Sequence, residues 1–197
     1  MTLFGKVDSA HFFDLYHHEQ SPDLSFVLDE YYTALGQESI TSKFFHLFSI
    51  IEYVEKNYIH LAETRPVFDE ADKLEVMKCL EQVKISKDKR ERLYGLVSGA
   101  MSRATEADRE EKLVRILHYM GIKEFRECGT QFVIEKRTIK ELTTLRNSYY
   151  HGDGKKVDET EKHISVELAV ARLMYICEGI ILYVMREESD RREHGEV

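Results

Sequence analysis

The sequence predicts an all-α protein with one domain, and three observations support this prediction. Apolar residues recur at intervals of three and four over most of the 197-residue chain. The chain contains only two prolines, and its turn-forming segments fall between the periodic stretches. An apolar share of 43% gives a chain of this length enough material for a sizeable core.

Local signals mark where most of the predicted helices begin and end. Ser21 and Pro22 form a helix start, with Ser as the N-cap and Pro in the first helical position, and Gly36 ends that helix. The same kind of reading predicts further helices at 38–62, 69–83, 87–103, 107–120 and 161–186, and one through Ile139 to Tyr149 that stops at Gly152. Residues 122–136 stay open: 132–134 fit an extended piece, whereas 124–126 fit a helix equally well.

The helix predicted over 161–186 is apolar on more than one face. A second copy of the chain is the simplest partner for the extra face, and the first 35 residues are the alternative. Glu167, Arg172 and Glu178 would be costly inside a membrane, so we expect a buried or interfacial helix. We therefore divide the chain into a helical lead-in packed on the domain (1–36), the helical domain (37–188) and a charged tail that frays (189–197).

The charge balance limits the kind of nucleic-acid contact that this protein can make. A net charge of −8 argues against binding along the whole surface. The window 135–156 nevertheless has six basic and three acidic residues, which fits either a local basic cleft or ordinary surface variation. Three scattered cysteines and the lack of an apolar leader at the start predict a cytoplasmic protein without a disulfide framework.

Three polar residues converge at the end of the helix that stops at Gly152. Asn147 and His151 are four residues apart and share a helix face. Arg146 precedes His151 by five residues, about 7.5 Å along the helix axis. A fixed cation beside a group that titrates near neutral pH suits chemistry on a phosphodiester.

The segment Arg146-Asn147-Ser148-Tyr149-Tyr150-His151 resembles the Arg-polar-x-x-x-His signature of HEPN domains. The upstream segment 44–52, which ends in Glu52, is similar to the first helix of HEPN domains of the ApeA type, where an acidic residue sits in an apolar setting. The resemblance covers roughly residues 12–185, with the middle third matched only in helical character. It implies an antiparallel bundle with a four-helix core and additional helices.

The resemblance also implies an activity, namely metal-independent RNA cleavage that leaves 2′,3′-cyclic phosphate ends, in bacterial antiphage defence or in a toxin-like role. Arg146, Asn147 and His151 would be the catalytic residues, with Glu52 supporting them, and no cofactor or metal would be needed. Lys155 and Lys156 are candidates for contacts with flanking phosphates. The partners implied are an RNA substrate, a second copy of the chain, and a regulator or a larger parent protein; no membrane is implied.

Other interpretations of these residues remain open. Arg146 and His151 can simply interact with the C-terminal dipole of their helix, in a non-catalytic interaction or RNA-binding module. Glu52 can equally be a surface carboxylate at the edge of an apolar stripe. Asp153 stands where nucleotidylated HEPN toxins carry a tyrosine, so we do not expect that form of regulation.

Overall fold

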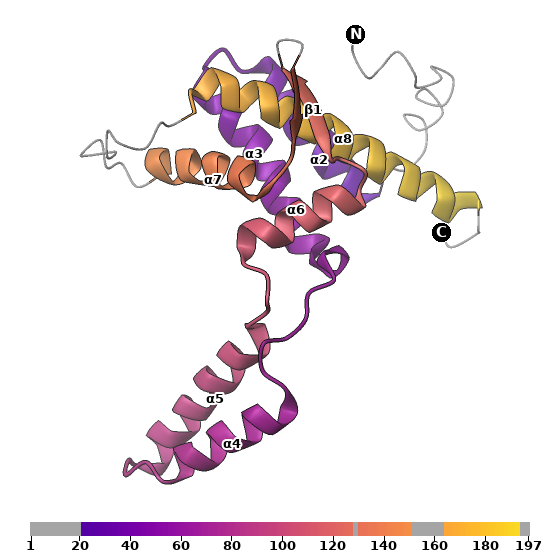
Figure 1. Cartoon of the computed structure of the whole chain (residues 1–197). Coiled ribbons are helices and arrows are strands. Elements are labelled where there is room, and N and C mark those ends of the chain that lie inside the picture. The colour runs from indigo at the N-terminus through magenta and orange to yellow at the C-terminus, as the bar shows by residue number, and fades with distance from the viewer. Residues whose placement is uncertain (1–20, 128–129, 151–163, 194–197) are drawn as a thin grey trace.

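The computed structural model describes residues 21–127, 130–150 and 164–193, and their fold is all-α, as predicted (Figure 1). The described residues form seven α-helices, one 3₁₀ helix and a single two-stranded hairpin. In chain order these are α2 (Pro22–Gly36), α3 (Ile40–Asn57), η2 (Ile59–Ala62), α4 (Glu70–Glu81), α5 (Lys87–Arg103), α6 (Arg109–Tyr119), β1 (Glu124–Glu127), β2 (Thr130–Val133), α7 (Lys136–Tyr150) and α8 (Val166–Glu193).

The hydrophobic core lies between α2, α3 and α8, and we call the part of the protein built around this core the body. The largest fully buried side chains of α3 and α8 are Phe44, Leu47, Ile50, Leu173, Ile176 and Ile180. Burial of one such side chain contributes about 1.5–3 kcal/mol relative to leaving it exposed. Helix α2 packs against both α3 and α8, and α6 packs against η2, α3 and α7. Because α6 contacts both α3 and α7, these three helices lie together in the bundle.

The helix predicted over 38–62 is divided by a break at Tyr58. Helix α3 ends at Asn57, and η2 continues the chain to Ala62. The backbone of Tyr58 has φ −112° and ψ 19°, which is not helical, and its ring is buried. Its hydroxyl donates a hydrogen bond of 2.8 Å to Asp23 of α2. The break therefore depends on a contact with a residue 35 positions away, which local periodicity does not reveal.

The extra apolar face of α8 is covered within the chain itself. Helix α2 lies against it, and the Tyr31 hydroxyl donates a 2.8 Å hydrogen bond to Glu178 of α8. The segment between α6 and β1 also packs on α8. It approaches Gly179 so closely that a Cβ atom there would lie 2.8 Å from Cγ1 of Ile122. Of the two partners considered for this face, the first 35 residues provide the one that the structure shows, through α2. By length and composition α8 could also cross a membrane, a test that core helices of soluble proteins pass as well.

Helix α8 runs to Glu193, beyond the end predicted at Arg186 and into the expected tail. Two ion pairs one turn apart, Glu187 with Arg191 and Glu188 with Arg192, support the added turns. Glu188 is buried and also accepts hydrogen bonds from the backbone and hydroxyl of Ser21. Residues 187–193, expected in the tail, are therefore helical in the structure, and Ser21 at the start of α2 anchors this part of α8.

The ambiguous segment 122–136 contains an antiparallel hairpin. Strand β1 pairs with β2, with Phe125 opposite Phe132. The extended interpretation of 132–134 is confirmed for Phe132 and Val133, and the helical alternative for 124–126 is wrong. Phe125 is buried, and the guanidinium of Arg172 in α8 lies 5.6 Å from the centre of its ring. Tertiary packing on α8 decides the conformation of this segment.

Helices α4 and α5 form a hairpin that projects away from the body, and we call residues 70–103 the arm (Figure 1). The two chain segments at its base pair as a short ladder, with an isolated bridge between Pro66 and Thr105 and a 2.9 Å hydrogen bond from the Val67 amide to the Ala104 carbonyl. Helix α4 buries none of its side chains, and α5 buries only Met101. Among the described residues, the hydrophobic core has no member between Ala62 and Leu113.

Candidate functional site

Helix α7 carries Arg146 and Asn147, the first two residues of the Arg-polar-x-x-x-His segment, at the edge of the bundle. Ile139, Leu142 and Leu145 are buried and fix the helix against the body. Near its end the ring of Tyr149 contacts Phe45 of α3 edge to face, with 6.3 Å between the ring centres. Between these contacts, Asn147 is exposed, and Arg146 and Ser148 are partly exposed.

Arg146 forms an ion pair with Glu52, which lies on α3. Its Nη2 atom is 2.7 Å from Glu52 Oε1, and the side chains are 25% and 40% exposed. The interpretation of Glu52 as a group that holds Arg146 is therefore consistent with the geometry, and Glu52 is not an isolated surface carboxylate. Asn147 is exposed, and its Oδ1 atom accepts a hydrogen bond of 3.4 Å from Arg146 Nη1. Glu52, Arg146 and Asn147 thus form one cluster.

His151, Lys155 and Lys156 lie outside the described residues. Their predicted roles therefore stay predictions. Helix α7 is described up to Tyr150, which is the residue immediately before His151. The described part of the site thus ends one residue short of the predicted catalytic histidine.

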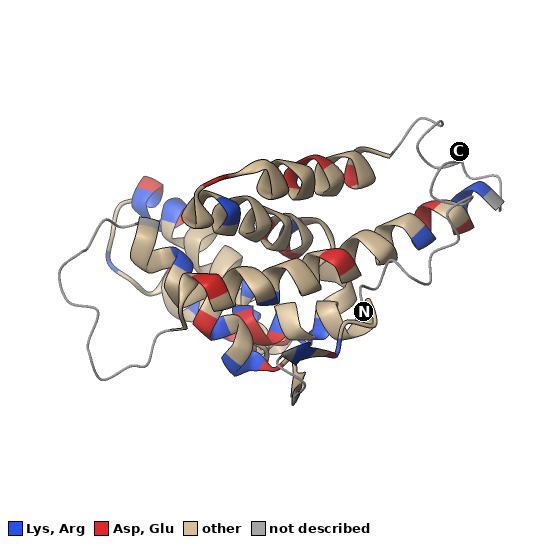
Figure 2. Ribbon diagram, turned by 90° about the horizontal axis from the view of Figure 1, so that it is seen from above, with Lys and Arg blue, Asp and Glu red and all other residues tan. Residues whose placement is uncertain are grey.

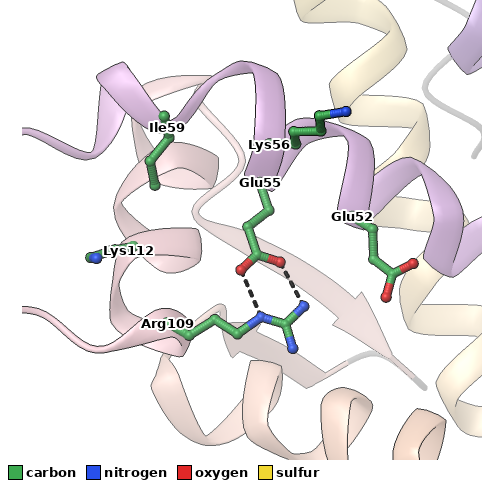
Figure 3. Close-up of a pocket in the computed structure, with 6 residues that line it drawn as sticks. All are labelled: Glu52, Glu55, Lys56, Ile59, Arg109 and Lys112. Carbon is green, nitrogen blue, oxygen red and sulfur yellow. Dashed lines mark hydrogen bonds and ion pairs between the residues drawn. The ribbon is translucent and has the colours of Figure 1, made fainter. Parts of the chain in front are cut away.

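A second carboxylate–arginine pair lies one helical turn along α3. Glu55 accepts two hydrogen bonds of 2.6 Å from Nε and Nη2 of Arg109, which belongs to α6 (Figure 3). This bidentate bond raises the pKa of Arg109 above its ordinary value; burial opposes that shift and the charge of Glu52 adds to it. Glu52 and Glu55 are three residues apart, so both project from the same side of α3.

A shallow pocket of about 460 Å³ opens beside these pairs. Six residues line it: Glu52, Glu55, Lys56, Ile59, Arg109 and Lys112 (Figure 3). In the close-up, Glu55 and Arg109 face one another across it, whereas the Lys56 and Lys112 chains turn away from that pair. The pocket is therefore lined mostly by charged side chains of both signs next to Arg146, and Ile59 is the one apolar residue among the six.

A third ion pair connects α6 to the start of α7. Lys136 pairs with Asp108, the N-cap of α6. The hydrogen bond from Lys136 holds the pKa of the Asp108 carboxyl below its usual range. The pairs Glu52–Arg146, Glu55–Arg109 and Asp108–Lys136 consequently link α3, α6 and α7 to one another. Such partly exposed pairs orient side chains more than they stabilise the fold.

The basic window 135–156 does not present a free basic cleft in its described part. Lys136, Arg137 and Arg146 pair with Asp108, Glu141 and Glu52 respectively. Of the four basic residues described there, Lys140 is the one with no ion-pair partner within the described chain. Acidic and basic residues are mixed across the body, as Figure 2 shows. Ordinary surface variation accounts for the described part of this window, residues 135–150.

Sequence reasoning missed Glu55 and Arg109. The spacing of Glu52 and Glu55 on one helix was a usable signal, because two carboxylates on one face call for nearby cations. Nothing local assigns Arg109 to them, since it lies 54 residues further along the chain. No group of three or more His, Cys, Asp or Glu side chains with metal-site geometry occurs within the described ranges.

Comparison with protein-family models, with curated proteins and with solved structures gives no match for this chain. The site is therefore interpreted from its own residues. Its chemical elements are a guanidinium held by a carboxylate, an adjacent exposed amide, and an imidazole one residue beyond the described end of α7. An oriented guanidinium can pair with two oxygens of a phosphate, and an imidazole can transfer protons near neutral pH.

Proposed function

We propose that this protein is a metal-independent endoribonuclease of the HEPN type. The observation that carries the proposal is the 2.7 Å ion pair between Glu52 and Arg146. It joins the two helices in which the resemblance locates the acidic residue and the Arg-polar-x-x-x-His segment. An arginine held in this way is oriented before substrate binds, which is what stabilisation of a developing charge requires.

The proposed reaction is an internal transfer at an RNA phosphate. The ribose 2′-oxygen attacks the adjacent phosphorus and forms a new O–P bond, the 2′-hydroxyl proton leaves to a base, and the bond from phosphorus to the 5′-oxygen breaks. A proton delivered to that oxygen completes the reaction, with a 2′,3′-cyclic phosphate and a 5′-hydroxyl as products. The nucleophile comes from the substrate, so the reaction does not require a metal-activated water.

Each site residue has a role in this scheme. His151 transfers protons, since an imidazole has the appropriate ordinary pKa. Arg146 pairs with the non-bridging oxygens, whose negative charge grows in the transition state. Asn147, already hydrogen-bonded to Arg146, orients the guanidinium or the phosphate. Glu52 is a positioning residue, and Lys155 and Lys156 contact flanking phosphates.

A homodimer and a role in bacterial antiphage defence belong to the same proposal and rest on the resemblance alone. The apolar face that suggested a dimer through α8 is covered by α2, so that face no longer argues for one. Sedimentation velocity at micromolar concentration measures the oligomeric state directly. A dimer is expected, and a monomer at all concentrations would contradict this part of the proposal.

The proposal is tested by incubating the purified protein with mixed RNA in the presence of a chelator. The expected result is fragmentation with 2′,3′-cyclic phosphate and 5′-hydroxyl ends. Fragmentation only after addition of a divalent metal, or fragments with 5′-phosphate ends, would contradict it.

A non-catalytic interaction module is the second candidate, and the arm is the observation that favours it. A helical hairpin that contributes no residue to the core cluster leaves most of its surface available to a partner. In that case RNA is not cleaved, and Glu52 and Arg146 act only as a link between α3 and α7.

A further inference from the structure

One face of α5 carries basic residues at helical spacing. Lys89, Arg92, Leu96, Gly99 and Arg103 follow one another at intervals of three and four, so they lie along one side of the helix. We call these five residues the basic face. It contains three cations and no carboxylate.

The cations of the basic face have no ion-pair partner within the described residues. The body differs in this respect, because most of its arginines are paired. These include Arg109, Arg115, Arg137, Arg146, Arg172, Arg191 and Arg192. On an otherwise acidic protein, a row of cations without ion-pair partners in the described chain is a surface to which an external anion can bind.

The surroundings of these cations support an external partner. Leu96, between Arg92 and Gly99, is 70% exposed. The guanidinium of Arg103 lies over Gly99, where a Cβ atom would be 3.3 Å from Nη1. The guanidinium thus lies along the surface of α5 instead of extending into solvent. Its planar N–H groups are held next to the same side of the helix as Lys89 and Arg92.

Charge along the chain distinguishes α5 and the turn before it from the rest of the protein. Residues 84–103 contain six basic and two acidic residues, a net charge of +4 in a chain of −8. The remaining residues are therefore strongly acidic. An acidic surface repels anions, which disfavours anion binding elsewhere on the protein. A polyanion is therefore expected to bind at α5.

We infer that the basic face of α5 binds the phosphate backbone of RNA. The choice of RNA among polyanions rests on the proposed function. The face carries no aromatic side chain, and the nearby Tyr94 is directed inward, with its hydroxyl bonded to the Met77 carbonyl at 3.2 Å. Stacking on bases is therefore absent from this contact, and binding depends on phosphates and not on sequence.

Binding is measured with a fluorescein-labelled RNA duplex and its single strand, using the full chain carrying His151→Ala so that RNA is not consumed. The test variant is Lys89→Gln/Arg92→Gln in the basic face. The control is Lys73→Gln/Lys78→Gln in α4, which removes the same charge from the same arm. Both use glutamine, a good helix former, and all four residues lie outside the core.

The test variant is expected to bind RNA on the order of tenfold more weakly at low salt. The slope of log Kd against log salt should fall by about one to two, since up to two phosphate contacts are lost. The control should bind like the parent. An equal loss in both variants, no RNA binding by the parent, or equally strong competition by polyglutamate would overturn the inference.

The two proposals fail in different ways. Arm-dependent RNA binding without any cleavage by the unmodified chain would contradict the nuclease and leave the basic face as an RNA-binding surface. Cleavage with cyclic-phosphate ends that is unaffected by Lys89→Gln/Arg92→Gln, with unchanged RNA affinity, would contradict the basic face and leave the nuclease.

Discussion

Glu52 of α3 lies 2.7 Å from Arg146 of α7 and holds the guanidinium at the edge of the bundle. One turn along α3, Glu55 holds Arg109 of α6 in the same manner but with two hydrogen bonds. Each pair joins a carboxylate of α3 to an arginine of another helix, and both carboxylates line the same pocket. They differ in that only the first belongs to the proposed catalytic cluster, which makes the second a matched control.

Glu52→Gln is expected to lower the rate of RNA cleavage by roughly tenfold or more, because Arg146 loses the group that orients it. The free energy of unfolding should fall by only about 1 kcal/mol or less, since the pair is partly exposed. Initial cleavage rates and chemical denaturation measure the two effects separately.

Glu55→Gln is the control for this variant. Its loss of stability should be at least as large, because it breaks a bidentate bond, while the cleavage rate stays near that of the parent. Equal losses of rate in both variants would mean that Glu52 acts only through stability.

Arg146→Lys should recover little of the activity that Arg146→Ala loses. An ammonium group keeps the positive charge but cannot pair with Glu52 and a phosphate through a planar set of N–H groups. The comparison requires cleavage rates for the three proteins at saturating RNA. Full activity in the lysine variant would reduce Arg146 to a general cation.

The contact of α2 with the end of α3 predicts loss of stability in alkali. Tyr53 and Tyr58 both donate hydrogen bonds to Asp23. Burial, followed by the hydrogen bond and charge of Asp23, raises the pKa of Tyr53 from 10.0 to about 12 and raises that of Tyr58 as well. The folded state thus favours neutral tyrosine. Its contribution is complete below pH 10 and is lost as the pH rises through about 12.

Tyrosinate absorbance during a pH titration measures this prediction. Asp23→Asn should shift the titration of Tyr53 toward lower pH, but not to 10.0, because burial remains. Titration of all tyrosines near pH 10 in the folded parent would show that the cluster does not form.

Gly179→Ala should destabilise the protein by about 1–3 kcal/mol. The added Cβ atom would lie 2.8 Å from Cγ1 and 2.9 Å from Cδ1 of Ile122, a buried and branched side chain with little freedom to move. Ile122→Val in the same chain should recover part of the loss. Gly95→Ala in α5, where the new atom meets nothing within 4 Å, should stabilise by about 0.5–1 kcal/mol. Thermal and urea unfolding measure both, and equal effects would contradict the close packing of α8 on Ile122.

The sequence predicted those parts of the fold that depend on local signals. The helix from Pro22 to Gly36 is confirmed at both ends, because Ser21, Pro22 and Gly36 act within one turn. Helix α5 is confirmed at 87–103 for the same reason. Contacts between residues far apart in the chain could not be predicted from local signals. The break at Tyr58 depends on its hydrogen bond to Asp23, and the last turns of α8 depend on the bond between Glu188 and Ser21, 167 residues away.

The same limit applies to the site. The resemblance implied that Glu52 supports Arg146, and in the structure the two side chains form an ion pair. The basic window 135–156 was harder to interpret, because the carboxylates that pair with Lys136 and Arg146 come from α6 and α3. Counting charges along the chain cannot show such pairing. The unpaired cations of α5 went unnoticed for the same reason.

The central claim is that Arg146 and His151 form a ribonuclease site, and end-group analysis of cleaved RNA tests it most directly. The unmodified protein, Arg146→Ala and His151→Ala are each incubated with RNA in a chelator, and the fragments are analysed by mass spectrometry. The account predicts 2′,3′-cyclic phosphate ends from the unmodified protein and none above background from either variant, with all three equally folded. Cleavage by His151→Ala at the rate of the unmodified protein would contradict it.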